Sequence, residues 1–167
     1  MDRLILLRHG KAEAEAPTGQ DFDRALTGRG GRDAALVARA LADAGHAPDL
    51  ALVSPAARAK ETWEAAAPFF PDAAVEWAPV LYHIDPLGIL DLASGQEQRV
   101  VMVVGHNPGL GELAVFLARD AGGGELAGFP TGAAAVIDFA PENVAQGGRR
   151  QAQAFALYTP KALGGGQ

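Results

Sequence analysis

The chain has 167 residues, of which 49% are hydrophobic and 20% are charged, with a formal net charge of −6 and no cysteine. This length suits one domain with a single buried core. The lack of cysteine excludes disulfides, thiolate metal sites and cysteine nucleophiles, and the negative charge argues against a broad nucleic-acid-binding face. Because no apolar run approaches the ~20 residues of a membrane span and Leu4–Leu7 is too short for a signal peptide, we expect a cytoplasmic protein without membrane contacts.

Six short segments predict the strands of the protein. Most are rich in aliphatic residues, as is typical of strands in a buried sheet, whereas Val75-Glu76-Trp77 is the shortest and contains a charge. In chain order, the expected strands are Leu4–Leu7, Leu50–Val53, Val75–Trp77, Val100–Val104, Ala133–Phe139 and Gln153–Tyr158. The last two are expected to pair as antiparallel strands joined around residues 141–148.

Helix-start signals lie between these runs, where a capping side chain precedes an amphipathic segment or a first-turn proline. In chain order, they are Thr27, Ser54-Pro55, Asp85-Pro86 and Asn107-Pro108. Strands that alternate with helices predict an α/β fold, a three-layer sandwich with helices on both faces of a mainly parallel sheet. We expect one domain over residues 1–160 and a disordered glycine-rich tail over residues 161–167.

Basic side chains and histidines follow three of the predicted strands. Arg8 and His9 come directly after the first strand, Arg58 lies shortly after the second, and His106 follows Val100–Val104. Ligands of α/β sheets collect outside the carboxyl ends of the strands, so these four side chains are expected to converge. Together with the nearby helix N-termini, whose free N–H groups favour an anion, they predict a phosphate pocket.

Each of these residues also has an ordinary structural explanation. A single histidine is usually a surface or packing residue, and we assign His46 and His83 to that class because neither follows a strand beside basic residues. An arginine on a helix, such as Arg58, is usually solvated. Arg8 fits such an explanation least, because an arginine directly after a buried strand needs a strong partner, which a bound phosphate would supply.

Three motifs, in this order, resemble those of the histidine phosphatase superfamily, whose fold is phosphoglycerate mutase-like. They are Leu7-Arg8-His9-Gly10, Ser54-Pro55-Ala56-Ala57-Arg58-Ala59-Lys60-Glu61-Thr62 and Gly105-His106-Asn107-Pro108-Gly109. Further segments are similar to the SixA-type phosphohistidine phosphatases within that superfamily. These are Asp23-Arg24-Ala25-Leu26-Thr27-Gly28-Arg29-Gly30, Leu81-Tyr82 and Phe129-Pro130-Thr131-Gly132. The resemblance covers nearly the whole chain.

The resemblance implies a phosphatase that needs no metal and no cofactor. His9 would attack phosphorus and become transiently phosphorylated, Arg8, Arg58 and His106 would hold the phosphoryl oxygens, and water would release inorganic phosphate. A neutral imidazole is nucleophilic near pH 7, and fixed cations stabilise the charge of the transferring group. Further candidates for substrate binding are Arg24, Asn107 and Thr131.

Members that cleave phosphate esters also use a carboxylic acid to protonate the leaving oxygen. Asp85 is expected to cap a helix, and Glu112 lies at a helical position that should turn away, so neither is assigned this role. A phosphoramidate needs less help, because its leaving nitrogen is readily protonated. We therefore expect the substrate to be phosphohistidine on a signalling or phosphotransfer protein. A small-molecule phosphomonoesterase and a phosphate-binding adaptor with little turnover are the alternatives.

Two other phosphatase chemistries are rejected on the motifs. The metal-binding motif of a metallophosphatase, Gly-Asn-His-Asp/Glu, has asparagine before histidine, whereas this chain has His106 before Asn107. Asp21 and Asp23 are similar to an aspartyl-phosphate motif, but no apolar strand precedes them. The segment from residue 21 to residue 29 is instead expected to border the pocket.

Overall fold

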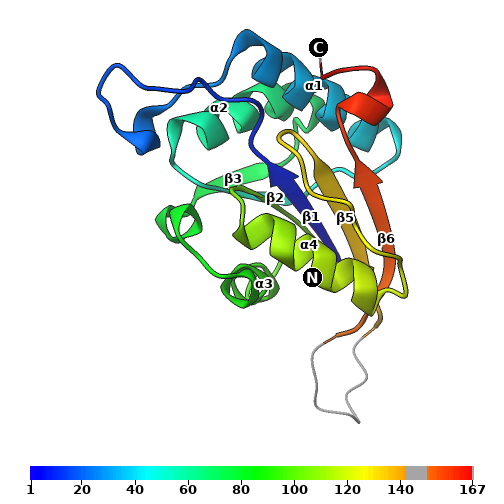
Figure 1. The fold of residues 1–167 in the computed structure, drawn as a ribbon. Coiled ribbons are helices and arrows are strands. Elements are labelled where there is room, and N and C mark those ends of the chain that lie inside the picture. Colours follow the sequence, from blue (N-terminus) through cyan, green and yellow to red (C-terminus); the bar gives the residue numbers. More distant parts are fainter. Residues whose placement is uncertain (142–149, 167) are drawn as a thin grey trace.

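A computed structural model describes residues 1–141 and 150–166 of the chain. One sheet with the strand order β3-β2-β4-β1-β5-β6 forms its centre, as Figure 1 shows. The strands are β1 (Arg3–Arg8), β2 (Leu50–Val53), β3 (Ala74–Trp77), β4 (Val100–Gly105), β5 (Ala134–Phe139) and β6 (Ala152–Tyr158). β3, β2, β4 and β1 run parallel to one another, whereas β5 is antiparallel to β1 and to β6. The sheet is therefore mainly parallel, as predicted, and the antiparallel pairing of the last two strands is confirmed.

Helices cover both faces of the sheet. They are α1 (Gly28–Asp43), α2 (Ala57–Ala66), α3 (Pro86–Ser94) and α4 (Gly109–Asp120). Short 3-10 helices lie at η1 (Asp21–Asp23), η2 (Ala67–Phe69), η3 (Pro79–Tyr82) and η4 (Lys161–Leu163). α1 and α2 lie on one face, with α3 and α4 on the other (Figure 1). This confirms the predicted three-layer sandwich.

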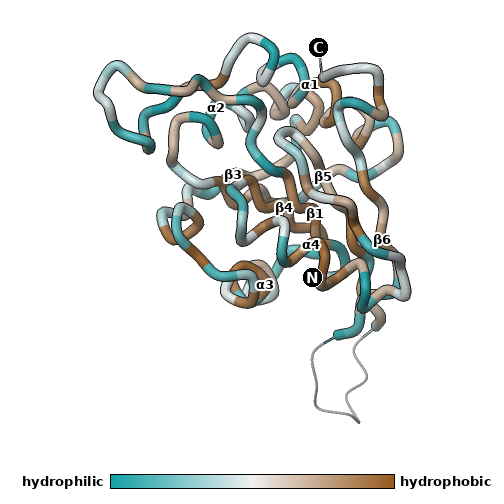
Figure 2. The backbone as a smooth tube through the Cα atoms, in the orientation of Figure 1, coloured by the Kyte–Doolittle hydropathy of each residue, from teal (hydrophilic) through white to brown (hydrophobic). Residues whose placement is uncertain are grey.

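Strand β1 shows why the central strands lack the polar alternation of a half-exposed sheet. Ile5 and Leu7 pack in the cluster that includes residues of α1 and α2, while Leu4 and Leu6 pack in the cluster on the side of α3 and α4. All four side chains are fully buried, and burying each contributes about 1.5–3 kcal/mol. Figure 2 shows the same hydrophobic concentration along the central strands. The core thus fixes the depth and direction of β1, and with it the place where the chain leaves the sheet.

Two of the four predicted helix caps are confirmed. The side chain of Thr27 accepts a hydrogen bond from the backbone N–H of Gly30 at 3.0 Å. The side chain of Asp85 accepts one from Gly88 at 3.0 Å. Asp85 therefore has the structural role expected for it at the start of α3.

The prediction at Asn107 is displaced by one residue. α4 begins at Gly109, with Pro108 at the N-cap position, yet the Asn107 side chain accepts a hydrogen bond from the N–H of Gly111 in the first turn at 3.0 Å.

The cap predicted at Ser54 is wrong, because α2 begins at Ala57, with Ala56 at the N-cap position. The hydroxyl of Ser54 is instead within hydrogen-bonding distance of the His106 ring, 2.8 Å from Nε2. The Ser54 side chain therefore contacts His106, which is distant in sequence, and does not cap the helix that follows it.

The C-terminal segment also differs from the expected disordered tail. Lys161–Leu163 form a 3-10 helix, and the N–H of Gly166 donates to the carboxylate of Asp33 at 2.9 Å. Asp33 is buried on α1, and a buried carboxylate requires donors, so this contact holds the tail against the helix. The predicted connection around residues 141–148 lies outside the described residues, except at Pro141. Among the described helices, none has the length and hydrophobicity needed to cross a bilayer.

Candidate active site

The three strands that carry the predicted site residues are neighbours in the sheet and end at the same level. Arg8 at the end of β1 is paired with Gly105 at the end of β4, and Val53 of β2 is paired with Val104. One residue further, the N–H of His9 donates to the Gly105 carbonyl at 3.0 Å. The predicted convergence at the carboxyl ends of the strands is therefore what the structure has.

The ring of His9 is held in one tautomer. Its Nδ1 lies 2.8 Å from the backbone carbonyl of Gly10, and because a carbonyl only accepts, Nδ1 must carry the proton. The lone pair is then on Nε2, which faces the Nε of Arg58 at 3.3 Å. Burial, aided by the positive charges of Arg58 and Arg8, lowers the pKa of His9 to about 4. His9 is thus a neutral imidazole at pH 7 with its lone pair directed at a cation.

His106 lies beside His9, with the two ring centroids 5.2 Å apart. Burial, followed by the charges of Arg58 and His9, lowers the pKa of His106 to about 3, so this ring is also neutral. In residues 1–141 and 150–166, the buried side-chain nitrogens that lack a hydrogen-bond partner are Nδ1 of His106 and Nε of Arg8. Because buried polar atoms are normally satisfied, two such atoms in one site indicate a polar ligand.

The two arginines are fixed by backbone carbonyls. Nη1 of Arg8 donates to the carbonyl of Phe129 at 2.8 Å, and burial lowers the pKa of Arg8. Arg58, which is only 5% exposed, donates from Nη1 to the carbonyl of Asp21 at 2.8 Å. These contacts hold two guanidinium groups near His9, and no carboxylate among residues 1–141 and 150–166 forms an ion pair with Arg8, an arrangement suited to a phosphoryl group.

The loop after β1 fits closely against the start of α1 and against α2. The N–H of Gly10 donates to the hydroxyl of Thr62 at 3.0 Å. A Cβ added to Gly10 would lie 2.4 Å from the carbonyl oxygen of Gly30, closer than real contacts allow. Glycine at this position therefore lets the backbone beside His9 pass close to α1, which helps fix the ring.

Asp21 and Tyr82 belong to the site but were not among the predicted site residues. The Asp21 carboxylate accepts hydrogen bonds from Arg58 at 3.0 Å, from Arg24 at 2.9 Å and from the Tyr82 hydroxyl at 2.7 Å. The Tyr82 ring meets the His106 ring edge-on, with centroids 5.6 Å apart. The sequence gives weak signals for both: Asp21 lies in a segment expected to border the pocket and in a rejected aspartyl-phosphate motif, and Tyr82 lies in a segment similar to SixA-type phosphatases.

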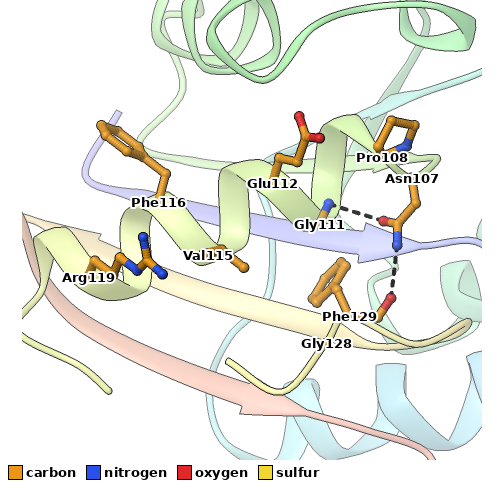
Figure 3. Close-up of a pocket in the computed structure, with 9 residues that line it drawn as sticks. All are labelled: Asn107, Pro108, Gly111, Glu112, Val115, Phe116, Arg119, Gly128 and Phe129. Atoms are coloured by element: carbon orange, nitrogen blue, oxygen red, sulfur yellow. Dashed lines mark hydrogen bonds between the residues drawn. The ribbon is translucent and has the colours of Figure 1, made fainter. Parts of the chain in front are cut away.

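The remaining candidates lie around this centre. Arg24 reaches it through Asp21. Thr131 lies in the turn whose next residue, Gly132, donates its N–H to the carbonyl of His9 at 2.9 Å. Asn107 links the segment at Phe129 to the start of α4. Its carboxamide donates to the carbonyl of Phe129 and accepts from the N–H of Gly111 (Figure 3). Direct substrate contacts of these three residues stay predictions.

Neither carboxylate considered for proton donation is identified as an acid by the structure. Asp85 caps α3. Glu112 is exposed and lines a groove of about 740 Å³ between α4 and the segment at Phe129 (Figure 3). Within the described part of the chain, no group of three or more histidine, aspartate or glutamate side chains is arranged to hold a metal ion.

Comparisons with known proteins agree with this geometry. Residues 4–81 match the family model of the histidine phosphatase superfamily, branch 1. The SixA structure from Agrobacterium tumefaciens is 33% identical, with a TM-score of 0.75 over 93% of this chain and 97% of that one. The chain belongs to the histidine phosphatase superfamily.

Two further relatives of this histidine phosphatase extend the comparison. The structure of the protein histidine phosphatase SixA complexed with tungstate is 25% identical, with a TM-score of 0.72, and the match covers 96% of this chain and 99% of that one. An uncharacterized chloroplastic protein of Arabidopsis thaliana is 34% identical over 128 residues, or 70% of this chain. The match spans only 59% of that curated relative. Because this relative is chloroplastic, the cytoplasmic location expected from the sequence stays a prediction.

Proposed function

We propose that this phosphatase hydrolyses phosphohistidine on a protein partner and that Nε2 of His9 accepts the phosphoryl group. The observation that carries the proposal is the fixed tautomer of His9, whose Nδ1–H donates to Gly10 at 2.8 Å and leaves a lone pair on Nε2. A pKa of about 4 keeps Nε2 unprotonated at neutral pH. These are the properties of a nucleophile that needs no separate base.

The other side chains have roles that follow from their charges and positions. Arg8 and Arg58 would bind phosphoryl oxygens and stabilise charge in the transition state. His106 would orient the phosphoryl group beside them, held in place by Ser54 at 2.8 Å. Tungstate, bound in the SixA complex, is a tetrahedral oxyanion like phosphate, which supports an anion site here.

The proposed reaction has two transfers. In the first, the bond from phosphorus to the substrate nitrogen breaks as the bond to Nε2 of His9 forms. In the second, water attacks phosphorus, Nε2 takes back its electron pair, and phosphate leaves with the protons of the water. Nδ1 of His9 keeps its proton throughout, because this N–H donates a hydrogen bond to the Gly10 carbonyl. The side chains named here carry out both steps, and we propose that no metal or cofactor takes part.

The partner would be a signalling or phosphotransfer protein that carries the phosphohistidine. The absence of an assigned general acid near His9 supports this substrate over a sugar phosphate, because the ring of phosphohistidine is readily protonated on its other nitrogen and then leaves as neutral imidazole. The test compares phosphate release from a phosphohistidine protein and from sugar phosphates, using wild type, His9→Ala and the control His46→Gln. His46 lies far from the site, beside Arg3.

We expect wild type and the control to release phosphate from phosphohistidine and to form an acid-labile phosphoenzyme, while His9→Ala does neither. Normal turnover by His9→Ala would show that the nucleophile is another residue. A preference of wild type for sugar phosphates would instead favour the phosphomonoesterase alternative. Stoichiometric phosphate binding without turnover would favour the adaptor.

A further inference from the structure

Asp21 presents a carboxylate at the mouth of a site that must bind an anion, which calls for an explanation. Its side chain is 53% exposed, whereas the side chain of its partner Arg58 is 6% exposed. The carboxylate therefore lies between the buried cation and the solvent from which a partner protein arrives. A negative charge there would repel a phosphoryl group unless it served another part of the substrate.

The two oxygens of the Asp21 carboxylate have different partners. Oδ2 accepts from Arg58 and Tyr82, whereas Oδ1 contacts a single side chain, Arg24, whose Nε donates to it and whose Nη2 also lies 2.9 Å away. The Arg24 side chain is 26% exposed, so a donor of the substrate could replace one of its two contacts with Oδ1. A phosphoryl group bound to Arg58 would compete with Asp21 for the guanidinium group. The Asp21 carboxylate would then interact less strongly with Arg58 and could accept a hydrogen bond from the substrate. The structure thus holds an anchored acceptor beside the entrance.

We propose that Asp21 makes the site selective for a phosphorylated imidazole, because its carboxylate accepts a hydrogen bond from the protonated ring nitrogen of the substrate. This proposal rests on the proposed phosphohistidine phosphatase function. In enzymes that cleave phosphate esters, a carboxylic acid assists the leaving group by protonating it. Here an ionised carboxylate would assist the leaving group by accepting a hydrogen bond from it. Asp21 would activate the leaving group without giving up a proton.

The positions of the proton and the electron pair during the transfer show how Asp21 would assist the leaving group. The substrate ring carries the phosphoryl group on one nitrogen and a proton on the other. When the P–N bond breaks and phosphorus bonds to Nε2 of His9, the electron pair returns to the substrate ring, which departs as neutral imidazole. The Gly10 carbonyl binds the Nδ1–H of His9 on one side, and Asp21 would bind the corresponding N–H of the substrate on the other.

Asp21 is suited to accept rather than to donate. Hydrogen bonds from Tyr82, Arg24 and Arg58 lower its pKa well below the ordinary value, so it stays ionised. The same carboxylate would oppose the negative charge that develops on the oxygen of a departing ester. One side chain therefore favours the imidazole substrate and disfavours the alternative, as specific sites commonly do.

The titratable and charged groups beside Asp21 are Arg24, Arg58 and Tyr82, and the rings of His83 and His106 pack against Tyr82. The hydrogen bond to Asp21 raises the pKa of Tyr82, while the pKa of His106 is lowered to about 3. An alkaline limb of kcat that lies between these limits and persists in His83→Gln would belong to the substrate ring.

The test measures kcat/KM and the pH dependence of kcat for phosphohistidine and for p-nitrophenyl phosphate, using wild type, Asp21→Asn and Asp23→Asn. Asp23 lies in the same 3-10 helix, but its carboxylate accepts from Thr18 at 2.7 Å, so it is the matched control. Asp21→Asn should lower kcat/KM for phosphohistidine about 10- to 100-fold more than for the ester. Each ratio comes from one protein sample, so a partly folded variant does not change it.

The pH profile separates this role from mere support of Arg58. Loss of the carboxylate lowers the pKa of the bound imidazolium, so the alkaline limb of kcat should move about one pH unit toward acid in Asp21→Asn. Equal losses for both substrates with an unmoved limb would overturn the proposal. Failure of the proposed function is a different result, in which wild type itself cleaves the ester but not phosphohistidine.

Discussion

Acidification should leave His9 neutral at pH values where an ordinary histidine is mostly charged. Its pKa is lowered from 6.5 to about 4, chiefly by burial. At pH 5, a group with a pKa of about 4 is ~90% neutral, whereas one at 6.5 is only ~3% neutral. A titration of the ring nitrogens by NMR from pH 8 to pH 3.5 measures this directly. A midpoint for His9 near 6.5 would refute the assignment of a buried, neutral nucleophile.

The same shift predicts how stability depends on pH. The folded-state pKa lies below that of the unfolded chain, so the contribution of His9 is complete above pH 6.5 and is lost as pH falls toward 4. The shift from 6.5 to about 4, at ~1.4 kcal/mol per unit, corresponds to ~3 kcal/mol. His9→Gln has no imidazole to protonate, so its unfolding free energy should fall by ~2.4 kcal/mol less than that of wild type between pH 7.0 and pH 4.5.

Urea unfolding of wild type and His9→Gln at pH 7.0 and pH 4.5 tests this difference. Other groups that titrate in this range, such as His106, are present in both proteins, so their effects largely cancel in the comparison. The same fall in unfolding free energy for both proteins would mean that His9 binds its proton as readily in the folded state as in the unfolded chain. The neutral, preformed nucleophile would then be excluded on energetic grounds.

Two further substitutions test how the surroundings hold the site. Gly10→Ala, whose Cβ would meet the Gly30 carbonyl at 2.4 Å, should lower the free energy of urea unfolding by about 1–3 kcal/mol. Gly31→Ala, which meets no atom within 4 Å, should raise it by up to ~1 kcal/mol, and equal effects of the two would contradict the close approach. Ser54→Ala removes the partner of His106 Nε2 and should reduce kcat about tenfold for an unfolding cost of about 1–3 kcal/mol. An unchanged kcat would show that this bond does not orient the ring.

The sequence predicted those parts of the site that depend on single elements. Arg8, His9 and His106 each follow an apolar run, and the carboxyl ends of parallel strands meet at one edge, so their convergence follows from local patterns. The caps at Thr27 and Asp85 were also predictable, because each side chain bonds an N–H three residues away. Short-range chemistry is visible in a sequence.

Asp21 and Ser54 show where such patterns fail. Asp21 bonds Arg58 and Tyr82, which lie 37 and 61 residues away along the chain. Ser54 has the local signature of a helix cap, yet its hydroxyl lies beside His106, 52 residues away. The partner of a polar side chain in a site depends on which strand ends are neighbours, and a single sequence does not state that order.

Strands β2, β4 and β1 end at the same level of the sheet, so the backbone sets the positions of the side chains that follow them. Hydrogen bonds hold adjacent strands about 4.8 Å apart whatever their side chains, and the rings of His9 and His106 lie 5.2 Å apart across that spacing. Residues 11–27 and 79–85, by contrast, lie outside the sheet and carry Asp21, Arg24 and Tyr82 beside this centre. Changes in these segments can therefore alter the surroundings of the centre while the strand ends keep His9 and His106 together, which fits a shared fold at 33% identity.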